Sequence, residues 1–155
     1  MPLLVAPVIL AGRRRLSRAA VRGLALAAAL AVTGLGAALL AQTHGVGVYW
    51  FGGFRPRHAV VLGVSFTVDT FGAWGVVLAG VVTGAALLAA GAWRRFGPLA
   101  YVLTLVVLAA ASGFCLTGDL FNLFVFFELM SVATIALCAL DTADTRADGL
   151  ENAVQ

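Results

Sequence analysis

Long apolar segments, separated by short polar or arginine-rich segments, dominate this sequence. A transmembrane helix requires about 20 mostly apolar residues. An apolar segment at 2–12 is too short to cross a bilayer, and we interpret it as the clipped remainder of a first span. The pattern therefore predicts an all-α membrane protein, a bundle of about five transmembrane helices whose first member is short. The four longer spans are expected near 23–41, 70–92, 98–117 and 120–140.

Segment 42–68 differs from the apolar segments on either side. It is rich in glycine and aromatic residues and contains Pro56, so an uninterrupted helix does not fit. Apolar and polar residues alternate near both of its ends, in VGVYWF and LGVSFTV. We therefore expect an extracytoplasmic β-hairpin-like loop, with Tyr49, Trp50 and Phe51 in the interfacial zone that aromatic residues favour.

Composition agrees with a membrane protein. Of the residues, 62% are hydrophobic and 11% are charged, and the mean hydropathy is +1.03. Soluble domains carry about 25% charged residues. The net charge is +3, and all the basic residues are arginines, since the sequence contains no lysine. These arginines lie between apolar segments instead of forming a basic domain. This distribution excludes a nucleic-acid-binding protein.

The arginines also predict an orientation in the cell membrane, because short cytoplasmic loops carry an excess of positive charge. If segment 13–22 is cytoplasmic, eight of the ten arginines lie inside and only Arg55 and Arg57 lie outside. This arrangement places the N-terminus outside and the polar tail, 141–155, in the cytoplasm. All 155 residues then form a single transmembrane portion.

Glu128 is the only acidic or basic side chain well inside a predicted span. It lies roughly 12 Å deep in a bilayer core about 30 Å thick. An ionised carboxylate at that depth costs several kcal/mol unless it is paired or hydrated, which favours a role in proton relay. The alternative is a permanently protonated side chain that only holds the bundle together. Ser131, one turn further on, either supports the carboxylate or bonds its own helix backbone.

Three polar residues lie where predicted spans begin. Asp119 is nine residues before Glu128, which places the two carboxylates on opposite faces of one helix. We expect Asp119 to cap that helix, with Asn122 in its first turn, and Asp69 to cap the span that starts near residue 70. A role in proton entry is the alternative. His44 and His58 lie in the outer loop and are interpreted as surface histidines, with pH sensing as the alternative.

Other residue patterns point to packing. Cys115 and Cys138 lie in apolar segments and have neither metal-site nor disulfide spacing, so we interpret them as small buried residues. Gly80 and Gly84 form a GxxxG pair that permits close helix contact in lipid. The sequence has no nucleotide-binding, zinc, serine-nucleophile or haem motif, so we expect no cofactor and no metal.

Segment 117–128, TGDLFNLFVFFE, resembles the fifth span of the antiporter-like membrane subunits. This family includes the D subunit of Mrp-type Na+/H+ antiporters and the proton-pumping subunits of respiratory complex I and of membrane-bound hydrogenases. The following LMSVATIALCAL and the earlier GVSFTVDTFGAW are also similar, and GLENAVQ looks like an amphipathic connection to a sixth span. The resemblance is closest to the Mrp D subunit.

The resemblance implies that Glu128 is essential for proton translocation and communicates with a lysine on a later span. The family's fold has about fourteen spans, whereas this chain holds about five spans of roughly 20 residues and contains no lysine. We therefore expect a partial version of that fold, an N-terminal fragment whose partners are other membrane subunits.

The leading hypothesis is that the chain is a subunit of a multisubunit antiporter that exchanges protons for Na+ or another monovalent cation. The chain would then be a transporter subunit and not an enzyme by itself. One alternative is a proton-pumping subunit of an NADH-quinone oxidoreductase or hydrogenase-type complex. A second alternative is an inactive truncated fragment or assembly partner.

Overall fold

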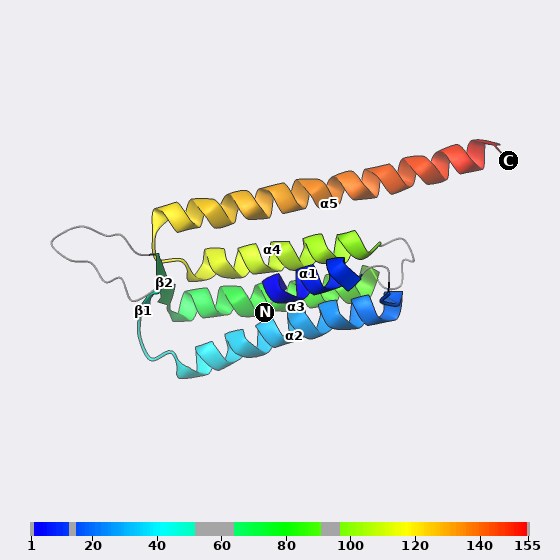
Figure 1. Cartoon of the computed structure of the whole chain (residues 1–155). Coiled ribbons are helices and arrows are strands. Elements are labelled where there is room, and N and C mark those ends of the chain that lie inside the picture. The colour runs from blue at the N-terminus through cyan, green and yellow to red at the C-terminus, as the bar shows by residue number, and fades with distance from the viewer. Residues whose placement is uncertain (1, 13–14, 52–63, 91–96, 155) are drawn as a thin grey trace.

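The computed structural model describes residues 2–12, 15–51, 64–90 and 97–154. Within these ranges the chain forms helices around a small antiparallel sheet (Figure 1). The elements in chain order are α1 (Pro2–Gly12), α2 (Arg18–Gln42), β1 (Gly47–Trp50), β2 (Ser65–Val68), α3 (Thr70–Ala90), α4 (Pro98–Leu116) and α5 (Leu120–Val154).

This architecture confirms the predicted membrane bundle with a short hairpin. In the described residues, four helices are long and apolar enough to cross a membrane, and α1 is an apolar helix of 11 residues that is too short to do so. In α5, the part with the length and hydropathy of a span is Leu120–Leu140, as predicted. Pro98 opens α4 in its first turn, where its missing N–H costs no helical hydrogen bond.

Two helices extend beyond the predicted spans. α2 begins at Arg18 instead of residue 23, because the Ser17 side chain accepts a hydrogen bond from the Ala20 N–H (3.2 Å) and so caps the helix. Arginine is also a good helix former. α5 continues through the polar segment that we predicted as a tail, up to Val154. That segment contains no proline, so its backbone can continue the helix.

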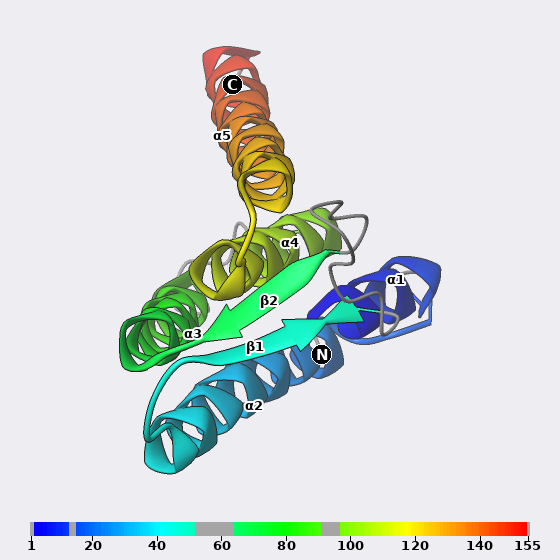
Figure 2. The same ribbon diagram turned by 90° about the vertical axis from the view of Figure 1, so that its left-hand side faces the viewer.

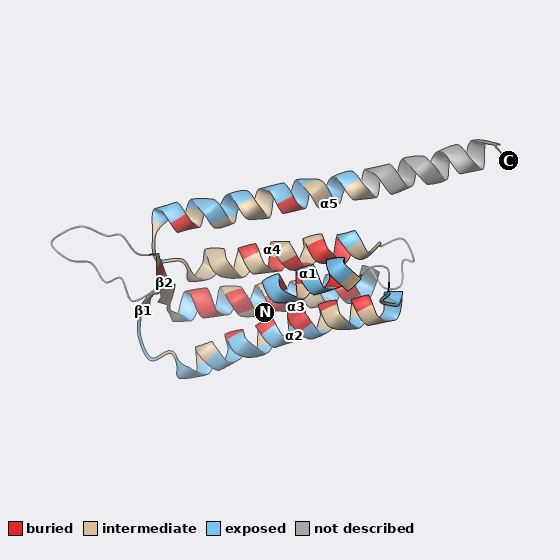
Figure 3. Cartoon of the chain, viewed as in Figure 1, coloured by how far each residue is buried: buried red, intermediate tan, exposed pale blue. Residues whose placement is uncertain are grey.

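Helices α1 to α4 share one apolar core (Figure 2). α3 packs between α2 and α4, and α1 packs against α4 and α2. The core side chains lie on the facing sides of these helices, whereas the outward sides are exposed and apolar, as expected for helices that face lipid (Figure 3). The largest fully buried side chains are those of Ile9, Val21, Leu105 and Leu108.

Glycines set the distance between α2 and α3. A Cβ on Gly80 would overlap the Thr33 hydroxyl oxygen and lie 3.0 Å from the Thr33 backbone nitrogen. A Cβ on Gly36 would lie 3.0 Å from side-chain atoms of Val76 and Val77. By contrast, a Cβ on Gly84 would meet only the Ala29 Cβ, at 4.0 Å. The GxxxG pair therefore packs against a helix as predicted, but only Gly80 needs to lack a side chain there.

The predicted hairpin is present. β1 and β2 pair antiparallel with Gly47 opposite Val68 and Trp50 opposite Ser65, and the Phe51 N–H donates to the Val64 carbonyl (2.9 Å). The residues that connect the two strands, 52–63, lie outside the described residues, and so do Arg55, Arg57 and His58 within them. β2 leads directly into α3, so the sheet lies at the end of the bundle where α3 and α5 begin (Figure 1).

Candidate functional site

The helix that carries Glu128 is the least covered part of the bundle. In an 18-residue apolar stretch of α5, 6% of the residues are buried, compared with 28–39% in the corresponding stretches of the other three candidate spans. Over the whole of Leu120–Leu140 the buried residues are Asn122 and Ala133, and among the helices α5 packs on α4. Most of the surface of Leu120–Leu140 therefore has no protein neighbour within the described residues (Figure 3).

Glu128 lies on this uncovered surface and is exposed. Phe121 and Phe124, which lie seven and four residues before Glu128 and so on the same face of the helix, are exposed by 76% and 59%. Further apolar side chains of α5, Val132 and Ile135, continue this exposed surface towards the other end of the span. We call Phe121, Phe124, Glu128, Val132 and Ile135 the Glu128 face.

Glu128 makes no hydrogen bond or ion pair to any residue that the structure describes. The arginines whose side chains the structure describes, Arg15, Arg18 and Arg22, lie just before α2 or in its first turns, so they do not pair with Glu128. Because a carboxylate in the bilayer is stable only when it is protonated, paired or hydrated, the Glu128 face needs polar groups or water from outside this part of the chain.

Ser131 bonds its own helix. Its hydroxyl donates to the Phe127 carbonyl at 2.9 Å. This is the bond to the helix backbone that we gave as the alternative to a role in supporting Glu128. In this position the hydroxyl lies one turn beyond Glu128 and does not hydrogen-bond to the carboxylate.

Asp119 caps α5 and also joins it to the hairpin. Its Oδ1 accepts a hydrogen bond from the Asn122 N–H (2.7 Å), which is the predicted N-cap bond. Its Oδ2 accepts a hydrogen bond from the Ser65 N–H (3.2 Å) in β2, and the Gly118 N–H donates to the Ser65 carbonyl (2.9 Å). Phe66 also forms a bridge with Thr117. The turn between α4 and α5 therefore lies along β2 like a short third strand.

Asn122 contributes to the α5 cap through its backbone N–H. Its side chain is 9% exposed, and its Nδ2 is buried without an acceptor. Asp69 caps α3 in the same manner as Asp119 caps α5, because its Oδ1 accepts from the Gly72 N–H at 2.6 Å. Both capping carboxylates lie at the hairpin end, and Asp119 is about 13 Å along the helix axis from Glu128. The fold does not bring them together with Glu128.

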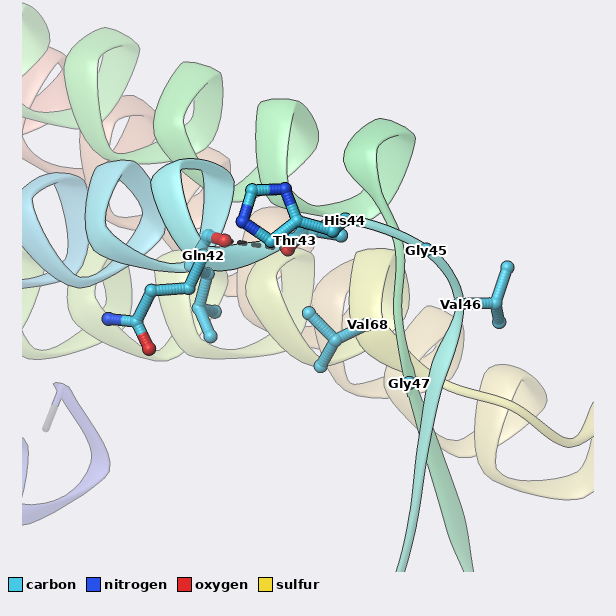
Figure 4. Close-up of a pocket in the computed structure, with 8 residues that line it drawn as sticks. Gln42, Thr43, His44, Gly45, Val46, Gly47 and Val68 are labelled. Carbon is cyan, nitrogen blue, oxygen red and sulfur yellow. Dashed lines mark hydrogen bonds between the residues drawn. The ribbon is translucent and has the colours of Figure 1, made fainter.

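An open groove of about 410 Å3, lined mainly by apolar surface, lies between the end of α2 and the hairpin (Figure 4). The Thr43 hydroxyl in this groove donates to the Leu39 carbonyl (2.6 Å), and His44 is its titratable group. The groove contains no residue of α5, so it is separate from the Glu128 face. The lining residues are Leu39, Gln42, Thr43, His44, Gly45, Val46, Gly47 and Val68.

The sequence of the chain is similar to membrane subunits of two kinds of complex. It is 40% identical over 134 residues to the N subunit of the NADH-quinone oxidoreductase of Desulforudis audaxviator. The aligned residues cover 81% of this chain and 26% of that protein. It is 35% identical over 104 residues to a Rhizobium meliloti protein that is named as the D subunit of a probable K+/H+ antiporter. This alignment covers 66% of this chain and 19% of that protein. No protein-family model matches the chain.

Solved structures show the same fold. A chain of the Mrp complex from a Dietzia species matches with a TM-score of 0.71 and 32% identity, over 88% of this chain and 25% of that chain. A chain of the membrane-bound sulfane sulfur reductase, an archaeal respiratory membrane complex, matches with a TM-score of 0.77 and 22% identity, over 94% of this chain and 31% of that chain. The chain thus spans between a fifth and a third of the length of these proteins.

Proposed function

This chain belongs to the family of antiporter-like membrane subunits, and on that basis we propose that it works in a multisubunit monovalent cation/proton antiporter, with Glu128 as the residue that takes up and releases the proton. At the coarser level, it is a multi-pass membrane subunit of an Mrp-like or complex I-like complex of the antiporter type, which translocates protons.

The observation that carries the proposal is the position of Glu128 on the uncovered face of α5. The carboxyl is exposed in the middle of a segment with the length and hydropathy of a span, and no described residue pairs with it. In a medium of low dielectric constant the neutral form of a carboxyl is favoured, and a nearby cation favours the charged form. A cation that approaches and leaves would therefore make Glu128 release and take up a proton.

The cationic partner of Glu128 would come from outside the part of the chain that the structure describes, because the sequence contains no lysine and the arginines with described side chains lie near the start of α2. The family resemblance points to a lysine on a later span. Helices that cover the Glu128 face would bring this partner and exclude lipid from the carboxyl.

Na+ is the cation that we propose first, because segment 117–128 resembles the Mrp D subunit and an Mrp complex is a structural neighbour. The Rhizobium meliloti relative is named for K+, so K+ is the next cation to test. The second candidate function is a redox-driven proton pump. The 40% identity to a membrane subunit of an NADH-quinone oxidoreductase favours that alternative.

We also propose an orientation. The segment before α2 and the hairpin lie at opposite ends of the bundle (Figure 1). Because arginines gather before α2, the positive-inside rule puts that end in the cytoplasm and the hairpin outside. Asp69 and Asp119 would then lie at the outer surface.

The first test is to purify the assembled complex in mild detergent and to identify its subunits by mass spectrometry. We expect other membrane subunits without flavin or iron–sulfur absorbance. In everted vesicles, addition of Na+ or K+ should then dissipate a preformed pH gradient. Subunits that carry those redox cofactors would replace the antiporter with the redox-driven pump, and a chain recovered without partners and without transport would contradict both.

A further inference from the structure

We propose that the Asp119 carboxylate is a positioning residue, which holds α5 against the hairpin and thereby fixes the place of Glu128 in the membrane. This inference rests on the proposed function, since it names what positions the proton-carrying group. It assigns to Asp119 a role beyond that of a helix cap.

The contacts of Asp119 join elements that are distant in the sequence. One carboxylate oxygen accepts from α5 itself, at the Asn122 N–H, and the other accepts from β2, at the Ser65 N–H. The second bond spans 54 residues of sequence. β2 continues into α3, whose own cap is Asp69, so Asp119 connects α5 to the part of the bundle that is best packed.

The junction leaves no space for a different arrangement. A Cβ on Gly118 would overlap the Thr67 hydroxyl oxygen and lie 2.8 Å from the Ser65 hydroxyl oxygen. A Cβ on Gly72, on α3, would lie 2.5 Å from the Cys115 carbonyl oxygen. The Ser65 and Thr67 side chains therefore pack against Gly118, next to Asp119, and α3 packs against the end of α4 at Gly72, next to Asp69, so this end of the bundle can act as a rigid support.

α5 depends on this support more than the other helices do, because it has few other contacts. An 18-residue apolar stretch of α5 buries 6% of its residues, and the helix packs along α4. Besides the Asp119 bond and the backbone contacts of Thr117 and Gly118 just before the helix, α5 contacts β2 through the Phe126 ring, whose centroid lies 6.5 Å from that of Phe66. A helix held along one side can slide or rotate, and the hydrogen bonds at its first turn limit both movements.

Glu128 is close enough to Asp119 to follow such a movement. The two residues lie on one helix, about 13 Å apart along its axis, and a helix of this length moves as a rigid body. A displacement or rotation at the first turn would therefore reach the carboxyl and change its distance from the proposed cationic partner.

Two substitutions in the complete complex separate this role from capping and from proton relay. Asp119→Asn keeps one oxygen for the cap, but places an amide N–H2 against the Ser65 N–H. Ser65→Pro removes the donated hydrogen and leaves the Asp119 charge intact. Because the Ser65 N–H points to Asp119, this proline leaves the neighbouring bond from the Phe51 N–H to the Val64 carbonyl in place. Asp69→Ala is the matched control, because it removes a cap that does not bridge elements.

The first measurement is the distance between spin labels at Tyr49 and at Thr134, which is exposed on α5 outside the Glu128 face, with Cys115 and Cys138 replaced by alanine. The second is the pH profile of cation-driven proton transport per assembled complex. We expect both Asp119→Asn and Ser65→Pro to shift or broaden the distance, to lower transport about tenfold and to shift the profile, whereas Asp69→Ala changes none of these.

An unchanged distance in either bridging variant, or an equal change in Asp69→Ala, would overturn the positioning role. If the distance changes but the unmodified complex transports no cation in exchange for protons, the proposed function fails and the positioning of α5 by Asp119 stands. The two failures are therefore distinguishable.

Discussion

Replacement of Glu128 by glutamine is expected to lower cation-driven proton transport by the assembled complex by at least about 100-fold. Glutamine has nearly the same size and fits the same exposed position on α5, but it cannot bind and release a proton at physiological pH. Because Glu128 makes no hydrogen bond or ion pair to the part of the chain that the structure describes, its replacement should leave the fold of that part intact. The measurement is the rate at which Na+ or K+ dissipates a pH gradient in everted vesicles, normalised to the amount of complex.

Two further variants serve as controls for this result. Ser131→Ala removes a hydroxyl on the next turn that bonds only the Phe127 carbonyl, so transport should stay within about twofold of the original rate. Glu128→Asp keeps the proton but shortens the side chain, and should retain a fraction of the activity. Full transport by Glu128→Gln would show that the carboxyl is structural and that the proton takes another route.

Local patterns in the sequence were sufficient to predict the main elements. The apolar segments predicted the four long helices, because span length and hydropathy alone identify them. The alternation around Tyr49 and Phe66 predicted the hairpin, and the caps at Asp69 and Asp119 followed from the residue type at the start of each span. Each of these features depends on residues close together in the chain.

Features that depend on distant residues were not predictable. The bond from Ser65 to Asp119 joins positions 54 residues apart, and an aspartate before a helix looks the same in sequence whether or not a strand lies beside it. The sequence also offered no means of telling that Gly80 needs to lack a Cβ while Gly84 does not, because both belong to one GxxxG pattern. Which side of α5 is covered is likewise a matter of tertiary packing, since apolar residues lie on every side of the segment and its few polar residues include both the buried Asn122 and the exposed Glu128.

The difference between these two glycines leads to the second large effect, which concerns stability. Gly80→Ala should destabilise the protein by about 1–3 kcal/mol, because the new methyl group overlaps Thr33. The Thr33 hydroxyl cannot easily move aside, since it donates to the Ala29 carbonyl at 3.0 Å. Its backbone nitrogen and Cα lie 3.0 and 3.2 Å from the position of the new Cβ, so α2 and α3 would have to separate.

Gly84→Ala is the matched control, one turn further along the same helix. Its new methyl group would lie 4.0 Å from the Ala29 Cβ, which is an ordinary contact, and alanine favours a helix over glycine by about 1 kcal/mol. We therefore expect stability that is unchanged or slightly increased. The stability of the purified complex can be compared from its unfolding in increasing concentrations of denaturant, followed by tryptophan fluorescence, to which Trp74 in α3 contributes.

A double substitution tests whether the Thr33 side chain causes the Gly80→Ala effect. Thr33→Ala removes the overlapping hydroxyl, so it should restore part of the stability lost in Gly80→Ala, whereas it should have no such effect in the Gly84→Ala background. The restoration should be incomplete, because the backbone atoms of Thr33 remain close to the new Cβ. Equal stabilities for Gly80→Ala and Gly84→Ala would contradict the close approach of α2 and α3 at Gly80, and with it the reason for a glycine at that position.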